Sequence, residues 1–547
     1  MYFRNVLRGF FLALAFASMT GCSQSGSGLP PAPASSFALS PDTTLRVHWM
    51  GKRGMQLRMG SYYLMRIWQL KISDDLQART LSRLASSASS HWLATSPEKA
   101  QIANGLLEYS LKDLVQNECY LEVRQPANQP TAEFVFAIHL DPERAAYWET
   151  NLANITGLLT GTFPAPSVTD LRGWSLDRTN PPNRFQFVRV NDWAVFGAGT
   201  GSNTLFSEIR DRVRQYDDPF AATASTNWLE ADVDLARWPG SLAQTWLGSG
   251  NSPEISFTVT GDGANVLTRG NLVFPETLHL ECEPWTPPAD LIPEPLNSFT
   301  AVRGLKPWLS SLKFWRDLPI DTAPGQLYFW ALPGAAAQAF FAAPLPDASN
   351  QVSRLTEYLM EKSNPWLAAR GYVKFEHLPG SNGASWGTMP SLQPFFKYMN
   401  TANGAMVFGG LLPDTTPGTN TQDNLYQRPS RSRLFDQISA QTNLVYYDWE
   451  LTGTRIDPCL YLCQVSRVVS RHAQLPLEST SLKWLKAAAP GLGDCTTTIT
   501  CVGTNRLSFF RKSTVGFTGA ELQLLADWLE SPQFSGGLYS TLTPPGN

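Results

Sequence analysis

Three pairs of neighbouring strand-like segments constrain the fold of this chain more than any other feature. In each pair, two runs rich in β-branched and aromatic residues are joined by a short turn of polar residues, proline or glycine. The pairs are 119–124 with 131–140, 185–190 with 193–196, and 255–260 with 266–274. Segments joined by so short a turn pair antiparallel, because a parallel pair requires a crossover of a dozen or more residues. The sequence therefore predicts sheets built from antiparallel hairpins.

Helices are predicted between these hairpins. Asp141 and Pro142 have the positions of an N-cap and a first helical residue, and apolar residues follow them at helical spacing. Near the C-terminus, Thr518-Gly-Ala-Glu521 reads as a capping box ahead of an amphipathic segment. Hairpins that alternate with single helices indicate an α+β fold rather than a doubly wound parallel sheet.

Five prolines between residues 282 and 298 mark a boundary between two domains. Prolines at this density are incompatible with a central strand or a helix interior, and a chain of 547 residues is long enough for two cores. Hairpins followed by helices occur in both halves, a pattern compatible with a divergent duplication. The predicted segments are a signal peptide (1–21), a flexible tether (22–41), an N-terminal α+β domain (42–281), a proline-rich linker (282–298), a C-terminal α+β domain (299–531) and a tail (532–547).

The first 22 residues have the pattern of an export signal. Arg4 and Arg8 precede an apolar run, 9–19, that is too short to span a bilayer as a permanent anchor. Small residues follow the run and lead to Cys22. The simpler alternative is an ordinary secreted protein that is cut nearby, with Cys22 incidental.

Thr20-Gly21-Cys22 resembles the lipobox of bacterial lipoproteins, although Met19 stands where that motif usually has leucine. The resemblance implies cleavage before Cys22 and attachment of lipid to its thiol. It also implies that, in a Gram-negative cell, Ser23, which is not aspartate, directs the protein to the outer membrane. The expected location is therefore the outer membrane or periplasm of a Gram-negative cell. Residues 23–40 are rich in serine, glycine and proline, a composition that predicts a flexible tether.

Charge and composition restrict the partners of the chain. Lys+Arg 43 and Asp+Glu 46 give a net charge of −3, which argues against binding to nucleic acid. No apolar run of the length of a membrane span follows the signal, so no transmembrane helix is expected. The expected partners are a membrane, contacted through the lipid anchor, and a protein or glycan ligand. No cofactor is expected.

Six cysteines remain once Cys22 is assigned to lipid, and an oxidising compartment would permit disulfides among them. Four lie close to the C-terminus: Cys459, Cys463, Cys495 and Cys501. The first two would share a face of a helix, and the last two end a strand-like run. A disulfide between these segments, free buried thiols and a four-thiolate zinc site are the alternatives. The wide spacing of the second pair argues against zinc.

One short pattern has enzymatic meaning. Gly383-Ala-Ser385-Trp-Gly387 matches the G-x-S-x-G nucleophile elbow of α/β-hydrolases. The residues of the corresponding triad would be Ser385, Asp448 or Asp457, and His472. A glycine-rich surface loop is the favoured interpretation, because residues 380–382 separate the motif from the preceding strand and short motifs often arise by chance.

Metal and glycan sites have weaker signals. The six histidines do not pair at helical spacing, and neither H-E-x-x-H nor a calcium loop occurs, so no metal site is expected. The chain has 18 tryptophans, and indole rings are common platforms for sugars. Five of them lie in predicted helices or strands, where burial is the ordinary outcome: Trp148, Trp193, Trp449, Trp484 and Trp528.

Residues 443–453 and 512–522 are similar to stretches of uncharacterised predicted envelope proteins of the planctomycete and verrucomicrobial kind. That resemblance implies no activity. Together these patterns favour a non-enzymatic envelope lipoprotein with a binding or structural role. The alternatives are a secreted serine hydrolase built on Ser385 and a glycan- or peptidoglycan-binding module.

Overall fold

The computed structural model describes most of the chain from Ser40 onward. The predicted signal peptide (1–21), Cys22, residues 23–39 of the tether and His472 lie outside the described part. The described residues are 40–94, 96–125, 132–166, 172–179, 182–199, 204–216, 219–220, 226–237, 251–333, 339–369, 371, 373–387, 393–411, 428–469, 478–531 and 534–535.

The first half of the body begins with a strand and a group of helices. Its elements are β1 (Thr43–Trp49), α2 (Gly51–Gln56), η1 (Met59–Ser61), α3 (Tyr62–Trp68), α4 (Lys71–Trp92), α5 (Pro97–Gln116), β2 (Cys119–Arg124), β3 (Glu133–His139), α6 (Pro142–Thr160), β4 (Ala165–Pro166), β5 (Gly173–Thr179), β6 (Pro182–Val190), β7 (Trp193–Gly199), α7 (Thr204–Gln215), β8 (Leu229–Asp234), β9 (Glu254–Gly261) and β10 (Val266–Val273). The three predicted hairpins are confirmed as β2–β3, β6–β7 and β9–β10.

The second half follows the proline-rich segment, which contains only a short 3-10 turn, η2 (Ala289–Leu291). Its elements are β11 (Ser298–Arg303), α9 (Lys306–Ser311), α10 (Lys313–Arg316), β12 (Gln326–Ala331), β13 (Phe340–Pro344), α11 (Ala348–Tyr358), η3 (Leu359–Ser363), α12 (Asn364–Ala369), β14 (Phe375–His377), β15 (Ala384–Trp386), β16 (Phe395–Thr401), β17 (Gly404–Gly410), α13 (Arg431–Ser439), β18 (Leu444–Leu451), α14 (Thr452–Val469), α15 (Thr480–Ala488), η5 (Ala489–Gly491), β19 (Asp494–Gly503), β20 (Arg506–Ser513) and α16 (Gly519–Glu530). The predicted α+β class is confirmed.

The strands form one antiparallel sheet whose two halves have the same order. From the centre outward, the first half reads β10-β9-β8-β1-β2-β3-β7-β6-β5-β4. The second half reads β20-β19-β18-β11-β12-β13-β17-β16-β15-β14. Strand β11 thus has the position in the second half that β1 has in the first, and the same holds for every later pair up to β20 and β10. This repeat of topology is what a divergent duplication would produce.

The two halves join edge to edge through their last strands, β10 and β20. Val266 lies opposite Ser513, and Val273 lies opposite Arg506. An antiparallel pair has a local two-fold axis perpendicular to the sheet, so equivalent halves that meet this way are related by an approximate two-fold rotation. The sheets of the two halves are continuous, because pairing satisfies the backbone groups that each final strand would expose at an edge.

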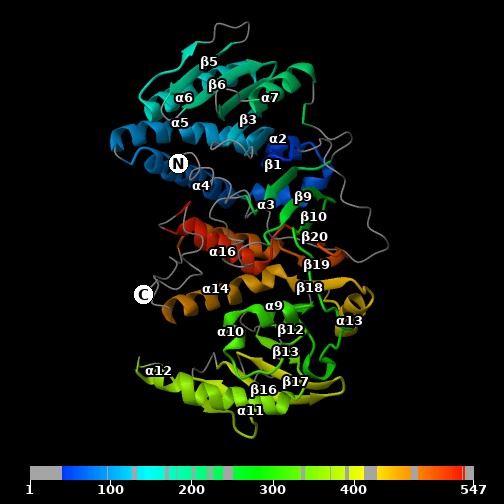
Figure 1. The fold of residues 1–547 in the computed structure, drawn as a ribbon. Coiled ribbons are helices and arrows are strands. Elements are labelled where there is room, and N and C mark those ends of the chain that lie inside the picture. The colour runs from blue at the N-terminus through cyan, green and yellow to red at the C-terminus, as the bar shows by residue number, and fades with distance from the viewer. Residues whose placement is uncertain are drawn as a thin grey trace.

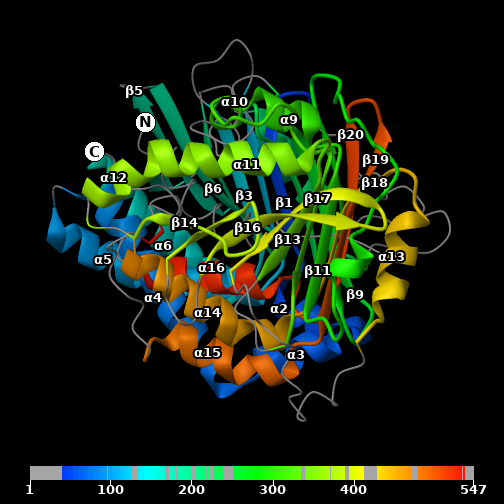
Figure 2. The same ribbon diagram turned by 90° about the horizontal axis from the view of Figure 1, so that it is seen from below.

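Helices from both halves pack together in the middle of the molecule. Figure 1 shows α4, α5, α14 and α16 stacked between the outer strands of the two halves. Ile67 of α3 shares one apolar cluster with Leu460 of α14, Leu485 of α15 and Leu522 of α16. Figure 2 shows α3, α4, α14 and α15 gathered along one side of the sheet. The halves are therefore held together by helix packing as well as by the β10–β20 pair.

Two helices occupy equivalent places in the repeat. Helix α7 packs Leu205, Ile209 and Val213 against strands β2, β3, β6 and β7. Helix α13 packs Leu434 and Ile438 against the corresponding strands of the second half and their neighbours. Each of these helices lies between the seventh and eighth strand of its half, so the repeat extends beyond the sheet.

The predicted helix starts are confirmed in detail. The Asp141 side chain accepts a hydrogen bond from the backbone N–H of Arg144 at 2.8 Å, and both bonds of the Thr518–Glu521 capping box are present. In the strand that precedes the Gly383 motif, the described paired residues are those of β14, Phe375–His377.

Candidate functional site

Ser385 lies in the middle of strand β15 and not at a strand-to-helix turn. Its neighbours in the sheet are Glu376 of β14 and Phe395 of β16, and its side chain is 4% exposed. A nucleophile elbow requires a helix directly after the serine, so the elbow interpretation is wrong, and so is a surface loop. The first glycine of the motif permits close strand packing instead: a Cβ at Gly383 would lie 1.9 Å from the carbonyl oxygen of Phe396.

The structure does not bring the predicted triad together. Asp448 belongs to β18, and five strands lie between β15 and β18 in the sheet. The Thr300 hydroxyl donates a hydrogen bond to Asp448 Oδ1 at 2.6 Å, so the carboxylate already has a partner on β11. Asp457, the alternative acid, is exposed on α14. His472, the predicted base, lies outside the described residues.

The C-terminal cysteines with described side chains are free thiols. Cys459 and Cys495 are buried, and Cys501 is half-buried. No disulfide therefore joins these three, whereas the side chain of Cys463 lies outside the described part. Burial raises the pKa of the Cys459 and Cys495 thiols above the ordinary value. Protonated, desolvated thiols of this kind are poor nucleophiles and behave as small apolar side chains.

A buried group of charges lies where helices α14 and α16 meet strand β18. We call it the C-terminal charge cluster: Asp448, Glu450, Arg455 and Arg511, which are buried, and Glu521, which is half-buried.

At its centre, Glu450 accepts hydrogen bonds from the backbone N–H of Gly519 at 2.6 Å and from the Thr452 hydroxyl at 3.0 Å. Arg455 forms an ion pair with the other carboxylate oxygen at 3.2 Å. One buried carboxylate thus fixes the first turns of two helices to the sheet, where the positive end of each helix dipole favours a negative charge.

The second ion pair of this cluster joins strand β20 to α16. Arg511 donates from Nη2 to Glu521 Oε1 at 2.9 Å, and Glu521 Oε2 accepts the Thr518 backbone N–H at 2.7 Å. The cluster then contains three carboxyl groups and two guanidinium groups. Burial, and secondly the charge of Glu450, raises the pKa of Asp448 to about 7. A proton on Asp448 would balance the charge of the cluster at neutral pH.

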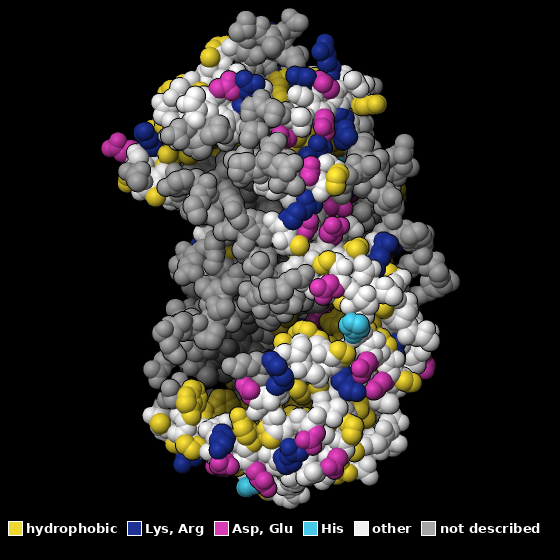
Figure 3. Space-filling model, in the orientation of Figure 1, with side chains coloured by type: hydrophobic (Ala, Val, Ile, Leu, Met, Phe, Trp, Pro, Cys, Tyr) yellow, Lys and Arg dark blue, Asp and Glu magenta, His cyan; other side chains and the backbone are white. Residues whose placement is uncertain are grey.

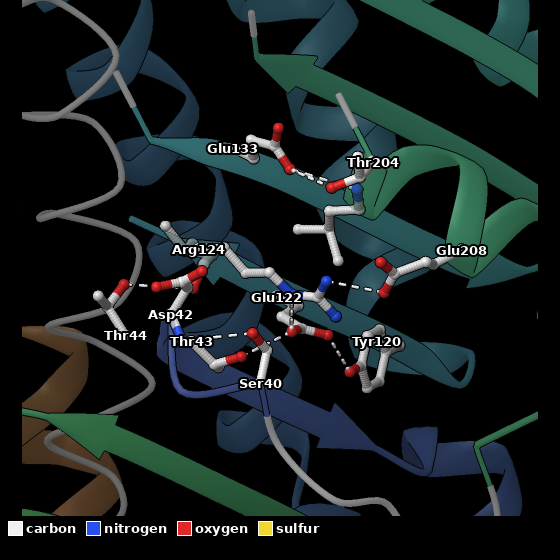
Figure 4. Close-up of polar contacts among 12 residues, drawn as sticks. Ser40, Asp42, Thr43, Thr44, Tyr120, Glu122, Arg124, Glu133, Thr204 and Glu208 are labelled. Atoms are coloured by element: carbon white, nitrogen blue, oxygen red, sulfur yellow. Dashed lines mark hydrogen bonds and ion pairs between the residues drawn. The ribbon is translucent and has the colours of Figure 1, made fainter. Parts of the chain in front are cut away.

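A second group, the N-terminal charge cluster, lies on strands β1, β2 and β8 in the first half: Arg46, Glu122 and Glu230, which are buried, and Arg124 and Asp232, which are half-buried. Figure 4 shows Glu122 between Tyr120 and Arg124, with Thr43 reaching it from β1. Glu122 accepts from the Tyr120 hydroxyl at 2.6 Å, the Thr43 hydroxyl at 2.8 Å and Arg124 Nε at 2.7 Å. The carboxylate therefore ties two neighbouring strands together through side chains.

Arg46 is buried between strands β2 and β8. It lies opposite Glu122 in one pair and opposite Asp232 in the other, and its Nε donates to Asp232 Oδ2 at 2.8 Å. Burial raises the pKa of Asp232, and the Arg46 guanidinium opposes that shift. Figure 4 also shows Glu133 beside the start of α7, where it accepts the Leu205 backbone N–H at 3.2 Å. A buried strand carboxylate at a helix start thus occurs in both halves.

The contacts of the two charge clusters indicate a structural role. The central carboxylates, Glu122 and Glu450, each have three donors from the protein itself, and both are nearly inaccessible to solvent. Such carboxylates are ionic locks that fix helices and strands in place, because a substrate would have to displace internal partners to reach them. The sequence does carry one signal for them: Asp448 and Glu450 interrupt an otherwise apolar strand.

Within the described part of the chain, no three His, Cys, Asp or Glu side chains are grouped to hold a metal ion, and none of the helices combines the length and the apolar composition of a membrane span. Of the five tryptophans singled out above, four are buried and Trp484 is half-buried, with its indole N–H donated to Ser73 at 2.8 Å. Among the tryptophans whose side chains the structure describes, Trp308 and Trp366 are exposed, at 46% and 52%.

Positive and negative side chains are interspersed over the face shown in Figure 3. The described side chains of that face therefore do not form a continuous belt of positive charge, which is the feature typical of a nucleic-acid-binding surface.

Comparisons of the chain with protein-family models, with curated proteins and with solved structures found no match.

Proposed function

We propose that the chain is an exported envelope protein, anchored to a membrane by lipid on Cys22, with a non-enzymatic binding or structural role. The observation that carries the proposal is the order of a basic start, a short apolar run and Thr20-Gly21-Cys22, followed by a serine-, glycine- and proline-rich stretch. The folded body begins at β1, about twenty residues after Cys22. A stretch of that length and composition lets a body stand off the membrane surface.

The structure of the body supports a role that does not involve catalysis. Its two central buried carboxylates, Glu122 and Glu450, hold helices and strands in place. Ser385 is paired within strand β15, and five strands of the sheet separate β15 from β18, the strand of Asp448. A continuous sheet stiffened by buried ion pairs suits a scaffold that presents its surfaces to a partner. The outer membrane of a Gram-negative cell, with the body in the periplasm or displayed at the surface, is the location we propose.

The proposal predicts that lipid is attached at a single residue. Cells that express the chain and are grown with labelled palmitate should incorporate the label into it, and Cys22→Ala should abolish incorporation, because the thiol of Cys22 is the attachment point. Cys282→Ala is the matched control, since it removes an exposed thiol from the described part of the chain. Labelling that survives Cys22→Ala would contradict the proposal.

A serine hydrolase built on Ser385 is the alternative that the structure weakens most. A fluorophosphonate probe should leave Ser385 unmodified, because its hydroxyl is buried within a strand. Detection of the probe on gels, with an active serine hydrolase labelled in parallel, makes a negative result meaningful. Labelling that disappears in Ser385→Ala would restore the hydrolase interpretation.

Glycan binding is the second candidate function, and the exposure of Trp308 and Trp366 favours it. Indole faces that are open to solvent can stack on sugar rings, whereas the buried tryptophans cannot. Purified peptidoglycan should then quench tryptophan fluorescence in the wild-type protein and less in Trp308→Ala/Trp366→Ala. Absence of quenching in the wild type would remove this candidate.

A further inference from the structure

An exposed apolar tip projects from the connection between α2 and α3. Leu57, Met59 and Tyr62 are 87%, 93% and 62% exposed. Three large apolar or aromatic side chains within six residues are an unusual concentration on a surface where single exposed apolar residues are normal. We refer to residues 56–63 as the apolar tip.

The apolar tip is held in place by buried polar contacts. The side chain of Ser61 is buried beneath it and donates to the carbonyl oxygens of Met55 at 2.7 Å and Arg58 at 2.9 Å.

The turn between β9 and β10 also supports the tip. The Tyr63 N–H donates to the carbonyl oxygen of Gly263 at 3.0 Å, and the Gly263 N–H donates to that of Gly60 at 2.9 Å. A Cβ at Gly60 would lie 2.5 Å from the carbonyl oxygen of Gly261, so this close approach requires glycine. The exposed side chains are therefore presented by an anchored backbone.

The chain around the tip is basic. From residue 43 to residue 73 it contains six lysine and arginine residues and no aspartate or glutamate, although the whole chain has a net charge of −3. Arg53, Arg58, Arg66 and Lys71 are exposed, and the Arg66 guanidinium lies 5.2 Å from the centre of the Tyr63 ring. One exposed acid, Asp262, lies in the supporting turn, where its carboxylate accepts the backbone N–H groups of Ala264 and Asn265.

We propose that the apolar tip docks into the headgroup region of a bilayer that contains anionic phospholipid. Leucine and methionine would enter the acyl boundary, tyrosine would lie at the interface, and the arginines would contact phosphate groups. Charge complementarity selects this occupant: an acid-free basic segment on an acidic protein fits an anionic surface.

The position of the tip along the chain supports the same choice. The tip follows β1 and α2, the first strand and the first helix of the body, and is therefore close in sequence to the tether that would lead to the membrane. The choice of a membrane rests in this respect on the proposed lipid anchor, which would bring the tip to the bilayer.

Vesicle binding of a chain that lacks the lipid tests docking separately from anchoring. Purified full chain with Cys22→Ser should co-sediment with vesicles of phosphatidylcholine that contain about 30 mol% phosphatidylglycerol. It should bind vesicles of phosphatidylcholine alone at least about tenfold more weakly, and added salt should weaken binding to the anionic vesicles.

Two variants in the same Cys22→Ser chain test the two contributions. Leu57→Ser/Met59→Ser should reduce the vesicle partition coefficient about tenfold or more, and Arg58→Glu should reduce it about fivefold or more. Ile102→Ser/Tyr109→Ser, which removes two exposed apolar side chains from α5, is the matched control and should leave binding unchanged. All these residues are exposed, so an unchanged unfolding transition is expected in each variant.

Absence of binding to the anionic vesicles would overturn the proposal, as would an equal loss in the α5 control. Self-association that is lost in Leu57→Ser/Met59→Ser would also overturn it, in favour of a protein contact. If palmitate is not incorporated but vesicle binding is intact, the proposed lipid anchor is contradicted and the proposed docking surface is not. The two proposals can therefore fail independently.

Discussion

Replacing Glu450 with alanine is expected to lower the free energy of unfolding by about 3–5 kcal/mol, which is the usual cost of removing one partner of a buried ion pair. The substitution would leave the Arg455 guanidinium buried without its carboxylate. It would also remove the acceptor of the Gly519 N–H and the Thr452 hydroxyl, at the first turns of α16 and α14. Both helices should then be less firmly attached to β18.

Chemical denaturation of the purified protein measures this effect. Glu376→Ala is the matched control, because Glu376 is an exposed acid on a strand of the same sheet and should change the unfolding free energy by less than about 0.5 kcal/mol. A loss below about 1 kcal/mol for Glu450→Ala would show that the cluster does not act as an ionic lock.

Replacing Asp448 with asparagine is expected to change how stability depends on pH. The pKa of Asp448 is about 7 in the folded protein, against 3.8 for an ordinary aspartate. The folded state therefore keeps a proton that the unfolded state has lost between these pH values. The contribution of Asp448 to the free energy of unfolding of the wild type is therefore fully present below pH 3.8. It falls as the pH rises from 3.8 to 7, and it is constant above pH 7. An asparagine side chain does not titrate, and its oxygen can still accept the Thr300 hydroxyl.

The difference between the two proteins isolates this group from all others. Relative to wild type, Asp448→Asn should gain on the order of 4 kcal/mol in unfolding free energy between about pH 4 and pH 8, since each pKa unit corresponds to about 1.4 kcal/mol. Urea titrations at several pH values provide the measurement, and Asp317→Asn, at an exposed acid, should follow the wild-type curve. A difference that does not vary with pH would mean that Asp448 is ionised in the folded protein throughout.

The sequence predicted the local elements of the fold well. The β6–β7 hairpin is determined by residues next to each other, and Asn191 in its turn has the positive φ of 50° that a tight turn needs. The capping box at Thr518 is likewise a contact within one helical turn. The helices between β1 and β2 were not predicted. The one feature that the sequence does show in part of this region is its charge: residues 43–73 are basic and contain no acid.

The arrangement of these elements could not be predicted from local patterns. The β10–β20 pair that joins the halves connects segments about 240 residues apart, and the repeat lies in strand order rather than in a shared residue pattern. The charge clusters depend on equally distant partners: Thr43 meets Glu122 and Gly519 meets Glu450 only through the register of the sheet. Neither the nucleophile elbow nor the surface loop expected at Ser385 is present, because a five-residue motif does not determine the structural context in which it lies.

The mature N-terminus tests the central proposal, a lipid-anchored envelope protein, most directly. Protein expressed in a Gram-negative cell and purified from its membranes should yield an N-terminal peptide that begins at Cys22 and has the added mass of a diacylglyceryl group on the thiol. A mature chain that begins at any other residue, or a Cys22 whose thiol is unmodified, would contradict the account.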